Sequence, residues 1–385
     1  MPRAISYEME MMFVGSEGAF DQTKNTGQYL SRVDFVQSYD FSFNVERQAL
    51  KQIGSGAFAS RQSQLAPDVD LNISYLLNDG WNEKYIGFDF VQNQYSNPLQ
   101  TIFSSTGDRN FYVLIAQDET RDANAATSVD NYNVLGIGNA YMVNYEISVA
   151  VNQLATVSCS FQGANASIQN YSTSTFLPAV NTYDKGQIAQ TNKKFGLVFY
   201  DNSRSSRNLT GFAKVFESGC SYRDCQITAT PTYAASALRF GLDLENFQSM
   251  SVSIPIERKP LYGFGSNHPK TRKVQKPVLG TFSVSSIVDS FSAENLATTF
   301  AAEDVTISGY NFDILFQKSV NKNKFGIKIQ NARLDSYSIG SQIGDRSVIS
   351  TNWSFEVTET TGILFSGSYG TPTQSAIYIN ESINP

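Results

Sequence analysis

Apolar and polar positions alternate with a period of two in several segments of this 385-residue chain. A period of two places the apolar side chains on one face of an extended backbone, as in a half-buried β-strand. The pattern therefore predicts strands in two parts of the chain. They lie at residues 41–45, 71–77, 145–151 and 157–161, and again at residues 282–284 and 349–357.

A spacing of four interrupts this alternation once in each part of the chain. Leu99 with Phe103, and Leu296 with Phe300, would each lie on one face of a helix. Ser292 precedes the second pair and is a residue type that often begins a helix. The spacing predicts one short helix in each part.

The two parts also share residue types in the same order, which indicates an internal duplication. Residues 45–55 and 256–266 have five identities at matching positions, and later segments beginning at Asn110 and Asn139 match those at Asn311 and Asn331. The identities pair Glu46, Arg47, Leu50, Gly54 and Ser55 with Glu257, Arg258, Leu261, Gly265 and Ser266. We expect a first copy over residues 1–162, a connector with some β structure over 163–221, and a second copy over 222–385.

The predicted fold class is mostly β. Each copy would form two packed antiparallel sheets, or a flattened barrel, with one short α-helix against it. Residues 52–64 are rich in Gly, Ser and Gln and are too many for a two-residue turn, so they predict a long protruding hairpin. Residues 263–273 lie at the corresponding place in the second copy.

Composition and charge restrict the function. Charged residues make up 17% of the chain, and the formal net charge is −6. A low charge density suits a surface that copies of the chain cover, and a net negative charge disfavours a nucleic-acid-binding surface. Glu8 and Glu10 break the apolar stretch that a signal peptide needs, and we expect no membrane segment.

The residues that usually carry chemistry are scarce. His268 is the single histidine, and Cys159, Cys220 and Cys225 are too few for a disulfide framework or a four-ligand zinc site. We expect free thiols, no metal, no cofactor and no enzyme activity. A pair of carboxylates for glycoside hydrolysis stays open as an alternative. Sugar stacking on Trp81 or Trp353 is a further one, although Trp353 lies in an alternating strand and fits a core role better.

The order of these features resembles the major tail-tube proteins of long-tailed, siphovirus-like bacteriophages, in the type whose tube domain is duplicated. The features are a strand, the motif at residues 46–55, a long hairpin, a strand at 71–77, a short helix and a closing strand at 156–163. The resemblance implies a virion protein, assembled in the host cytoplasm, whose sheets join into rings. Three chains would give a pseudo-six-fold ring, and stacked rings would form the tube that delivers DNA without binding it specifically.

The resemblance also implies partners and contacts. The partners would be further copies of the chain and the tape-measure, baseplate and tail-terminator proteins. The repeated hairpin motif would contact the next ring through Glu46, Arg47, Leu50, Gly54, Glu257, Arg258, Leu261 and Gly265. Two alternatives remain: another virion part, such as a baseplate-hub ring, tail terminator or decoration protein, and a carbohydrate-binding or hydrolytic module of a tail fibre.

Overall fold

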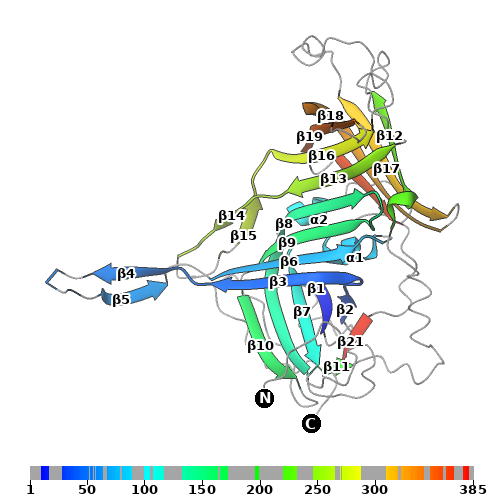
Figure 1. Cartoon of the computed structure of the whole chain (residues 1–385). Helices are drawn as coiled ribbons and strands as arrows, with labels where there is room; N and C mark the ends of the chain where they lie inside the picture. The colour runs from blue at the N-terminus through cyan, green and yellow to red at the C-terminus, as the bar shows by residue number, and fades with distance from the viewer. Residues whose placement is uncertain are drawn as a thin grey trace.

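The architecture is that of a computed structural model of the whole chain, shown in Figure 1. It describes residues 10–16, 28–63 without 52, 55 and 57, 67–88 without 79, 99–104, 107–116, 132–171 without 164, 196–198, 220–231, 246–264, 269, 271–287, 309–319, 322–341, 347–358, 361–367 and 376–380. The described chain is mostly β, as the alternation predicted.

The first half, residues 10–171, is a sandwich of two sheets that share one long strand. One sheet has the order β3-β6-β9-β8 and the other the order β2-β1-β7-β8-β10, all antiparallel. The strands are β1 (Glu10–Ser16), β2 (Gln28–Arg32), β3 (Val36–Asn44), β6 (Asp68–Leu76), β7 (Arg109–Ala116), β8 (Tyr132–Ala150), β9 (Thr156–Gly163) and β10 (Asn165–Tyr171).

The second half, residues 225–367, repeats this order. Its sheets run β13-β16-β19-β18 and β12-β17-β18-β20. The strands are β12 (Cys225–Pro231), β13 (Phe247–Pro255), β16 (Val278–Ile287), β17 (Tyr310–Ser319), β18 (Lys322–Gly340), β19 (Val348–Val357) and β20 (Ile363–Gly367). A 3-10 turn at Tyr222–Asp224 precedes them, and β11 (Gly196–Val198) pairs with β21 (Ala376–Asn380), which also pairs with β2.

The two halves agree in register as well as in strand order. The ladders of the two sheets in each half have three irregularities, and these fall at matching positions. They lie between Val36/Ser38 and Phe247/Ser249, between Arg109/Phe111 and Tyr310/Phe312, and between Met142/Asn144 and Leu334/Ser336. Glu46 and Glu257 also occupy the same topological place, after the first strand of the corresponding sheet.

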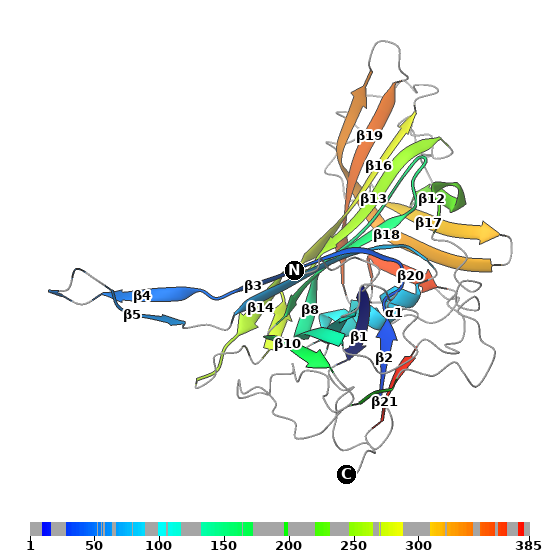
Figure 2. The ribbon, with the colours of Figure 1, turned by 60° about the horizontal axis from the view of Figure 1, so that its bottom comes forward.

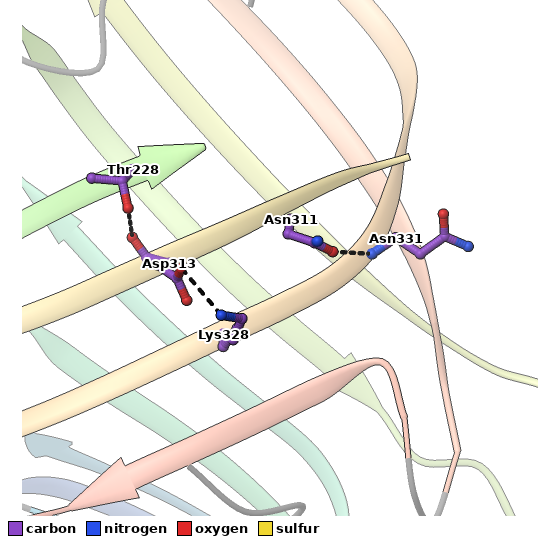
Figure 3. A network of polar contacts seen from close by, with 5 residues as sticks. All are labelled: Thr228, Asn311, Asp313, Lys328 and Asn331. Atoms are coloured by element: carbon purple, nitrogen blue, oxygen red, sulfur yellow. Dashed lines mark hydrogen bonds and ion pairs between the residues drawn. The ribbon is translucent and has the colours of Figure 1, made fainter. Parts of the chain in front are cut away.

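An asparagine bends the shared strand of each half. Asn139 in β8 and Asn331 in β18 have positive φ angles of 49° and 55°, a region that asparagine tolerates better than most residues. The backbone N–H of Asn139 donates to Oδ1 of Asn110 at 2.9 Å, and that of Asn331 donates to Oδ1 of Asn311 at 3.0 Å (Figure 3). The bend lets one strand serve both sheets of its sandwich.

A polar network on the β12-β17-β18-β20 sheet of the second half lies beside the bend at Asn331 (Figure 3). Lys328 of β18 forms an ion pair with Asp313 of β17 at 3.4 Å, and Thr228 of β12 donates to the Asp313 carbonyl at 3.5 Å. These contacts tie three neighbouring strands together across partly exposed surface. An ion pair of this exposure contributes at most about 1 kcal/mol, so the ladders and the core carry the stability.

The halves are joined edge to edge. Seven residue pairs connect β8 to β13, from Ser249 opposite Ala150 to Pro255 opposite Asn144. The result is one sheet of eight strands in the order β3-β6-β9-β8-β13-β16-β19-β18, which we call the continuous sheet. Figure 1 labels its strands.

One face of the continuous sheet packs into the core of each sandwich. Aromatic pairs fill equivalent places: Phe111 lies 4.6 Å from Phe161 between ring centroids, and Phe312 lies 5.0 Å from Trp353. Trp353 is buried, so its expected core role is confirmed, and Trp81 is buried as well.

Two short helices cover the first half. The helix predicted from Leu99 and Phe103 is α2 (Leu99–Phe103), with Leu99 and Ile102 buried. The sequence analysis missed α1 (Trp81–Ile86), whose single turn and a half is too short for a helical period to show. The helix expected around Leu296 and Phe300 lies outside the described residues.

The connector boundary needs a correction. Residues 165–171 form β10, which pairs with β8 along its whole length, so they belong to the first half and not to the connector. The apolar alternation here is sparse, with Ala166 and Ile168 among Ser, Gln and Asn, and polar residues dominate its pattern. Strand β11 lies within the segment expected to be a connector with some β structure.

Candidate assembly interface

The two outer edges of the continuous sheet, at β3 and β18, are equivalent to the edges of β13 and β8 that are joined inside the chain. Among the described strands, β3 pairs only with β6, and the part of β18 after its bend pairs only with β19. Their counterparts β13 and β8 pair with each other. An open edge exposes unpaired backbone N–H and C=O groups and is a template for another strand.

Three apolar side chains are exposed at positions whose counterparts in the other half are buried. Phe43 of β3 and Ile339 of β18 are each 50% exposed, and Ile168 of β10 is 71% exposed. The residues at matching positions of the other half, Ile254, Ile147 and Phe365, are each 0% exposed. Phe365 shows why, because its ring packs against Phe88 and Tyr145 of the first half. Each exposed residue therefore has a counterpart buried where the two halves meet.

Small polar side chains cover the face of the continuous sheet that lies opposite the core. They form hydrogen bonds across neighbouring strands, including one across the β8–β13 junction. These bonds join Ser249 to Ser285 (2.6 Å), Ser283 to Asn352 (2.6 Å), Asn352 to Ser336 (2.7 Å), Ser148 to Thr156 (3.0 Å) and Ser253 to Asn144 (3.4 Å). Acidic residues stand among them, with Asp40, Asp70 and Glu356 exposed. We call this surface the polar face.

The hairpin after β13 folds back on the first half. It consists of β14 (Arg258–Leu261) and β15 (Thr271–Val274) and carries two buried arginines, Arg258 and Arg272. Arg258 donates to the carbonyls of Met142 and Arg272 at 3.2 Å each, and to that of Ile102. Arg272 donates to the carbonyls of Gln162 and Gly163 at 2.7 and 2.9 Å.

A tyrosine ring lies beneath both guanidinium groups. The ring centroid of Tyr141 is 4.8 Å from Arg258 and 5.9 Å from Arg272, within the range of a cation–π contact. Burial lowers the pKa of Arg258 to about 10, so the group stays charged at neutral pH. Its charge is therefore held by carbonyl oxygens and a ring face, and we call this cluster the arginine clamp.

The matching hairpin after β3 is exposed. It consists of β4 (Arg47–Lys51) and β5 (Phe58–Ser63), and every residue of β4 is exposed. Figures 1 and 2 both show it projecting from the rest of the chain. The predicted protruding hairpin at residues 52–64 is thus present, and its strands begin at Arg47.

The residues expected to contact the next ring divide into three groups. Glu46, Arg47, Leu50 and Gly54 are exposed on the first hairpin, and Glu257 and Leu261 are exposed on the second. Gly54 has a φ of 87°, which favours glycine in this turn. Arg258 is buried in the arginine clamp. Gly265 and His268 lie outside the described residues.

Both hairpins present a large apolar residue near the tip. Ile53 is 103% exposed and Phe264, at the matching position, is 111% exposed. Leu50 and Leu261, also at matching positions, are 38% and 39% exposed. Sequence comparison paired the leucines but passed over Ile53 and Phe264, which are not identical.

A buried carboxylate in the first half is the strongest candidate for chemistry. Glu83 is 1% exposed and accepts hydrogen bonds from the hydroxyls of Tyr75 at 2.8 Å and Tyr145 at 3.2 Å. Burial raises the pKa of both tyrosines well above 10, with Cys159 and Glu83 adding to it. The group is enclosed in the core and ties α1 to the continuous sheet, which is a structural arrangement.

Other candidate sites were sought among the described residues. All three cysteines are free and buried, as expected, and burial raises the pKa of Cys225 to about 12. No three His, Cys, Asp or Glu side chains gather in the described part as a metal ion would require. Within that part, no helix has the length and apolar character needed to cross a membrane.

Comparison with known proteins gives weak matches. No protein-family model matches the chain, and no curated protein matches it. Among solved structures, the SPP1 tail tube matches with a TM-score of 0.29 and 12% identity over 44% of this chain and 80% of that one. The anti-feeding prophage baseplate matches with a TM-score of 0.26 and 8% identity over 44% of this chain and 97% of that one. Similarity at this level assigns the chain to no family.

The sequence held one further signal for this interface. Arg61 and Arg272 are the same residue type at matching positions of the two hairpins, as Arg47 and Arg258 are. The sequence analysis did not carry the comparison that far along the hairpins, and so it missed one arginine of the clamp.

Proposed function

We propose that the chain is a structural protein of a phage virion, duplicated within one chain, in which three copies close a pseudo-six-fold ring. The observation that carries this is the β8–β13 ladder. It joins two equivalent halves and leaves the equivalent edges, β18 and β3, at the ends of the continuous sheet. If β18 of one chain pairs with β3 of the next as β8 pairs with β13, the same rotation repeats at every junction, and we propose that six such junctions close the sheet into a ring.

The internal ladder also sets the register of the proposed contact. Because Ser253 lies opposite Glu146 inside the chain, Ser42 would lie opposite Ser338 of the neighbouring chain. By the same transfer Phe41 would lie opposite Ile339, and Phe43 opposite Tyr337. Closure would cover the exposed apolar residues Phe43, Ile168 and Ile339, which is the driving force we assign to it.

We assign the polar face to the channel of the ring. Small hydroxyl and amide side chains with interspersed carboxylates cover this face, and Asp40, Asp70 and Glu356 would repel DNA phosphates. One exposed cation, Arg333, lies opposite Ser354 on the same face. The net charge of −6 agrees with a channel through which DNA passes without specific binding.

Stacking of rings into a tube would use the hairpin tips. Ile53 and Phe264 are apolar, exposed and on matching positions, so a three-chain ring would present six such tips. Each hairpin also carries a second exposed apolar residue, Leu50 or Leu261, and clustered exposed apolar side chains mark protein contacts. Tape-measure, baseplate and tail-terminator proteins would meet the ends of the stack. We propose no catalytic role, no cofactor and no metal.

Electron microscopy and mass measurement of the purified protein test this function. We expect rings of three chains with six similar lobes, and tubes at higher concentration. Rings of six chains would refute the assignment of two ring places to each chain. A protein that stays monomeric over the whole concentration range would refute the assembly role itself.

A further inference from the structure

We infer that the β4–β5 hairpin clamps the neighbouring chain of the same ring through Arg47 and Arg61, as β14–β15 clamps its own first half. The inference rests on the proposed ring. It assigns these arginines to a contact within the ring, whereas the sequence resemblance placed the motif between rings.

The two hairpins start from equivalent places. Arg47 matches Arg258 and Arg61 matches Arg272, each pair at the same distance from the preceding strand of the continuous sheet. Arg258 and Arg272 are buried because the first half lies beside β13. The neighbour that would lie beside β3 is the second half of another chain. Its absence from a single chain explains why the β4–β5 arginines are exposed.

The acceptors of the clamp are backbone carbonyls, which do not depend on side-chain identity. Inside the chain they belong to Met142, Gln162 and Gly163. Arg258 also donates to the carbonyl of Arg272 within the hairpin and to that of Ile102, whose counterpart lies outside the described residues. The matching positions on the second half of the neighbour are Leu334, Ser354 and Phe355, in strands β18 and β19 that keep the same register. Carbonyls are therefore present at the same places for Arg47 and Arg61.

The charges around the proposed clamp differ from those inside the chain. Arg333 stands where the internal clamp has Tyr141, so the neighbour brings a third cation in place of an aromatic face. Asp335 stands at the position of Val143, whose carbonyl accepts the N–H of Ile256 at the base of the hairpin. The contact between chains would thus be weaker than the one within a chain, as suits a junction that assembles after folding.

The first test removes the clamp from a chain that still folds. Arg47→Ala with Arg61→Ala should raise the apparent dissociation constant of the three-chain ring by at least about tenfold, measured by mass photometry over a concentration series. Gln48→Ala removes an exposed polar side chain from the same hairpin, at a position whose counterpart Lys259 is also exposed, and should change it less than about twofold. An unchanged thermal unfolding midpoint, measured at a concentration at which both proteins are monomeric, would show that the double variant is folded.

The second test acts in the opposite direction, which misfolding cannot mimic. Arg333→Tyr installs the residue of the internal clamp and should tighten the ring by at least about threefold. A double variant that forms rings as tightly as the wild type, or an Arg333→Tyr variant whose rings are weaker, would overturn the clamp and leave the proposed ring intact. A wild-type protein that forms no ring would overturn both.

Discussion

The hairpins β4–β5 and β14–β15 have equivalent positions and matching arginines, yet one is exposed and the other is packed. The difference lies in what stands beside them. Strand β13 continues into β8 of the same chain, and the hairpin that follows it finds carbonyls within reach of Arg258 and Arg272. Strand β3 ends the sheet, and the hairpin that follows it projects (Figure 1). The packed hairpin is the template for our proposal of what the exposed one does after assembly.

The strand edges lead to the same conclusion. Ile147 and Ile339 occupy one position of the fold, and so do Ile254 and Phe43. The first member of each pair is buried where the two halves meet, and the second is half exposed at an open edge. Substitutions at matched positions should therefore act on folding in one case and on assembly in the other.

The largest effect is expected from the edge pair. Ile147→Ala should lower the free energy of unfolding of the monomer by about 2–5 kcal/mol, because a fully buried side chain is removed from the junction. Ile339→Ala should lower it by less than about 1 kcal/mol and instead weaken ring formation. Urea unfolding at a concentration that keeps the protein monomeric checks both. Equal losses would break the comparison.

The arginines give the next largest difference. Arg258→Ala should cost the monomer about 1–3 kcal/mol, since it removes charged hydrogen bonds to buried carbonyls. Arg47→Ala, at the exposed position, should change monomer stability by no more than about 0.5 kcal/mol. The same unfolding measurement serves, and a costly Arg47→Ala would mean that the hairpins are not equivalent in the way described.

Alkaline pH should destabilise the first half. Burial raises the pKa of Tyr75 and Tyr145 well above 10, so these groups keep their protons in the folded state while the unfolded chain loses them. Stability is fully present below about pH 10 and should fall as the pH rises above that value. Tyr75→Phe should reduce the slope of unfolding free energy against pH between about 10 and 11.5. An unchanged slope would contradict the role given to burial.

The smallest effect on folding is expected at the tips. Ile53→Ser with Phe264→Ser should leave stability within about 0.5 kcal/mol, because both side chains are fully exposed. Rings should still form, but tubes should be short or absent in electron micrographs. Tubes of normal length would place the stacking surface elsewhere, first in the connector at residues 172–219.

Much of this architecture could be predicted from the sequence. Alternation located the strands, and the repeated Glu-Arg motif located both hairpins, because backbone period and turn chemistry are local properties. Whether each hairpin is exposed or packed could not be predicted. Arg47 and Arg258 stand in the same local sequence pattern, and only the strand that lies beside each decides whether its arginine is exposed or buried. Helix α1 was missed for a related reason, since Glu83 is a polar residue whose burial depends on Tyr75 and Tyr145.

A cross-link between the open edges tests the central claim most directly. All three native cysteines are buried, so Ser42→Cys and Ser338→Cys, both at exposed positions, can be introduced together in one chain. Opposed residues of antiparallel strands have Cα atoms about 4.5–5.5 Å apart, within the range of a disulfide. Mild oxidation should give covalent dimers and trimers and nothing larger, while a Ser38→Cys with Ser338→Cys control should give none. Cross-linked species of more than three chains, or no cross-link in assembled protein, would contradict ring closure in this register.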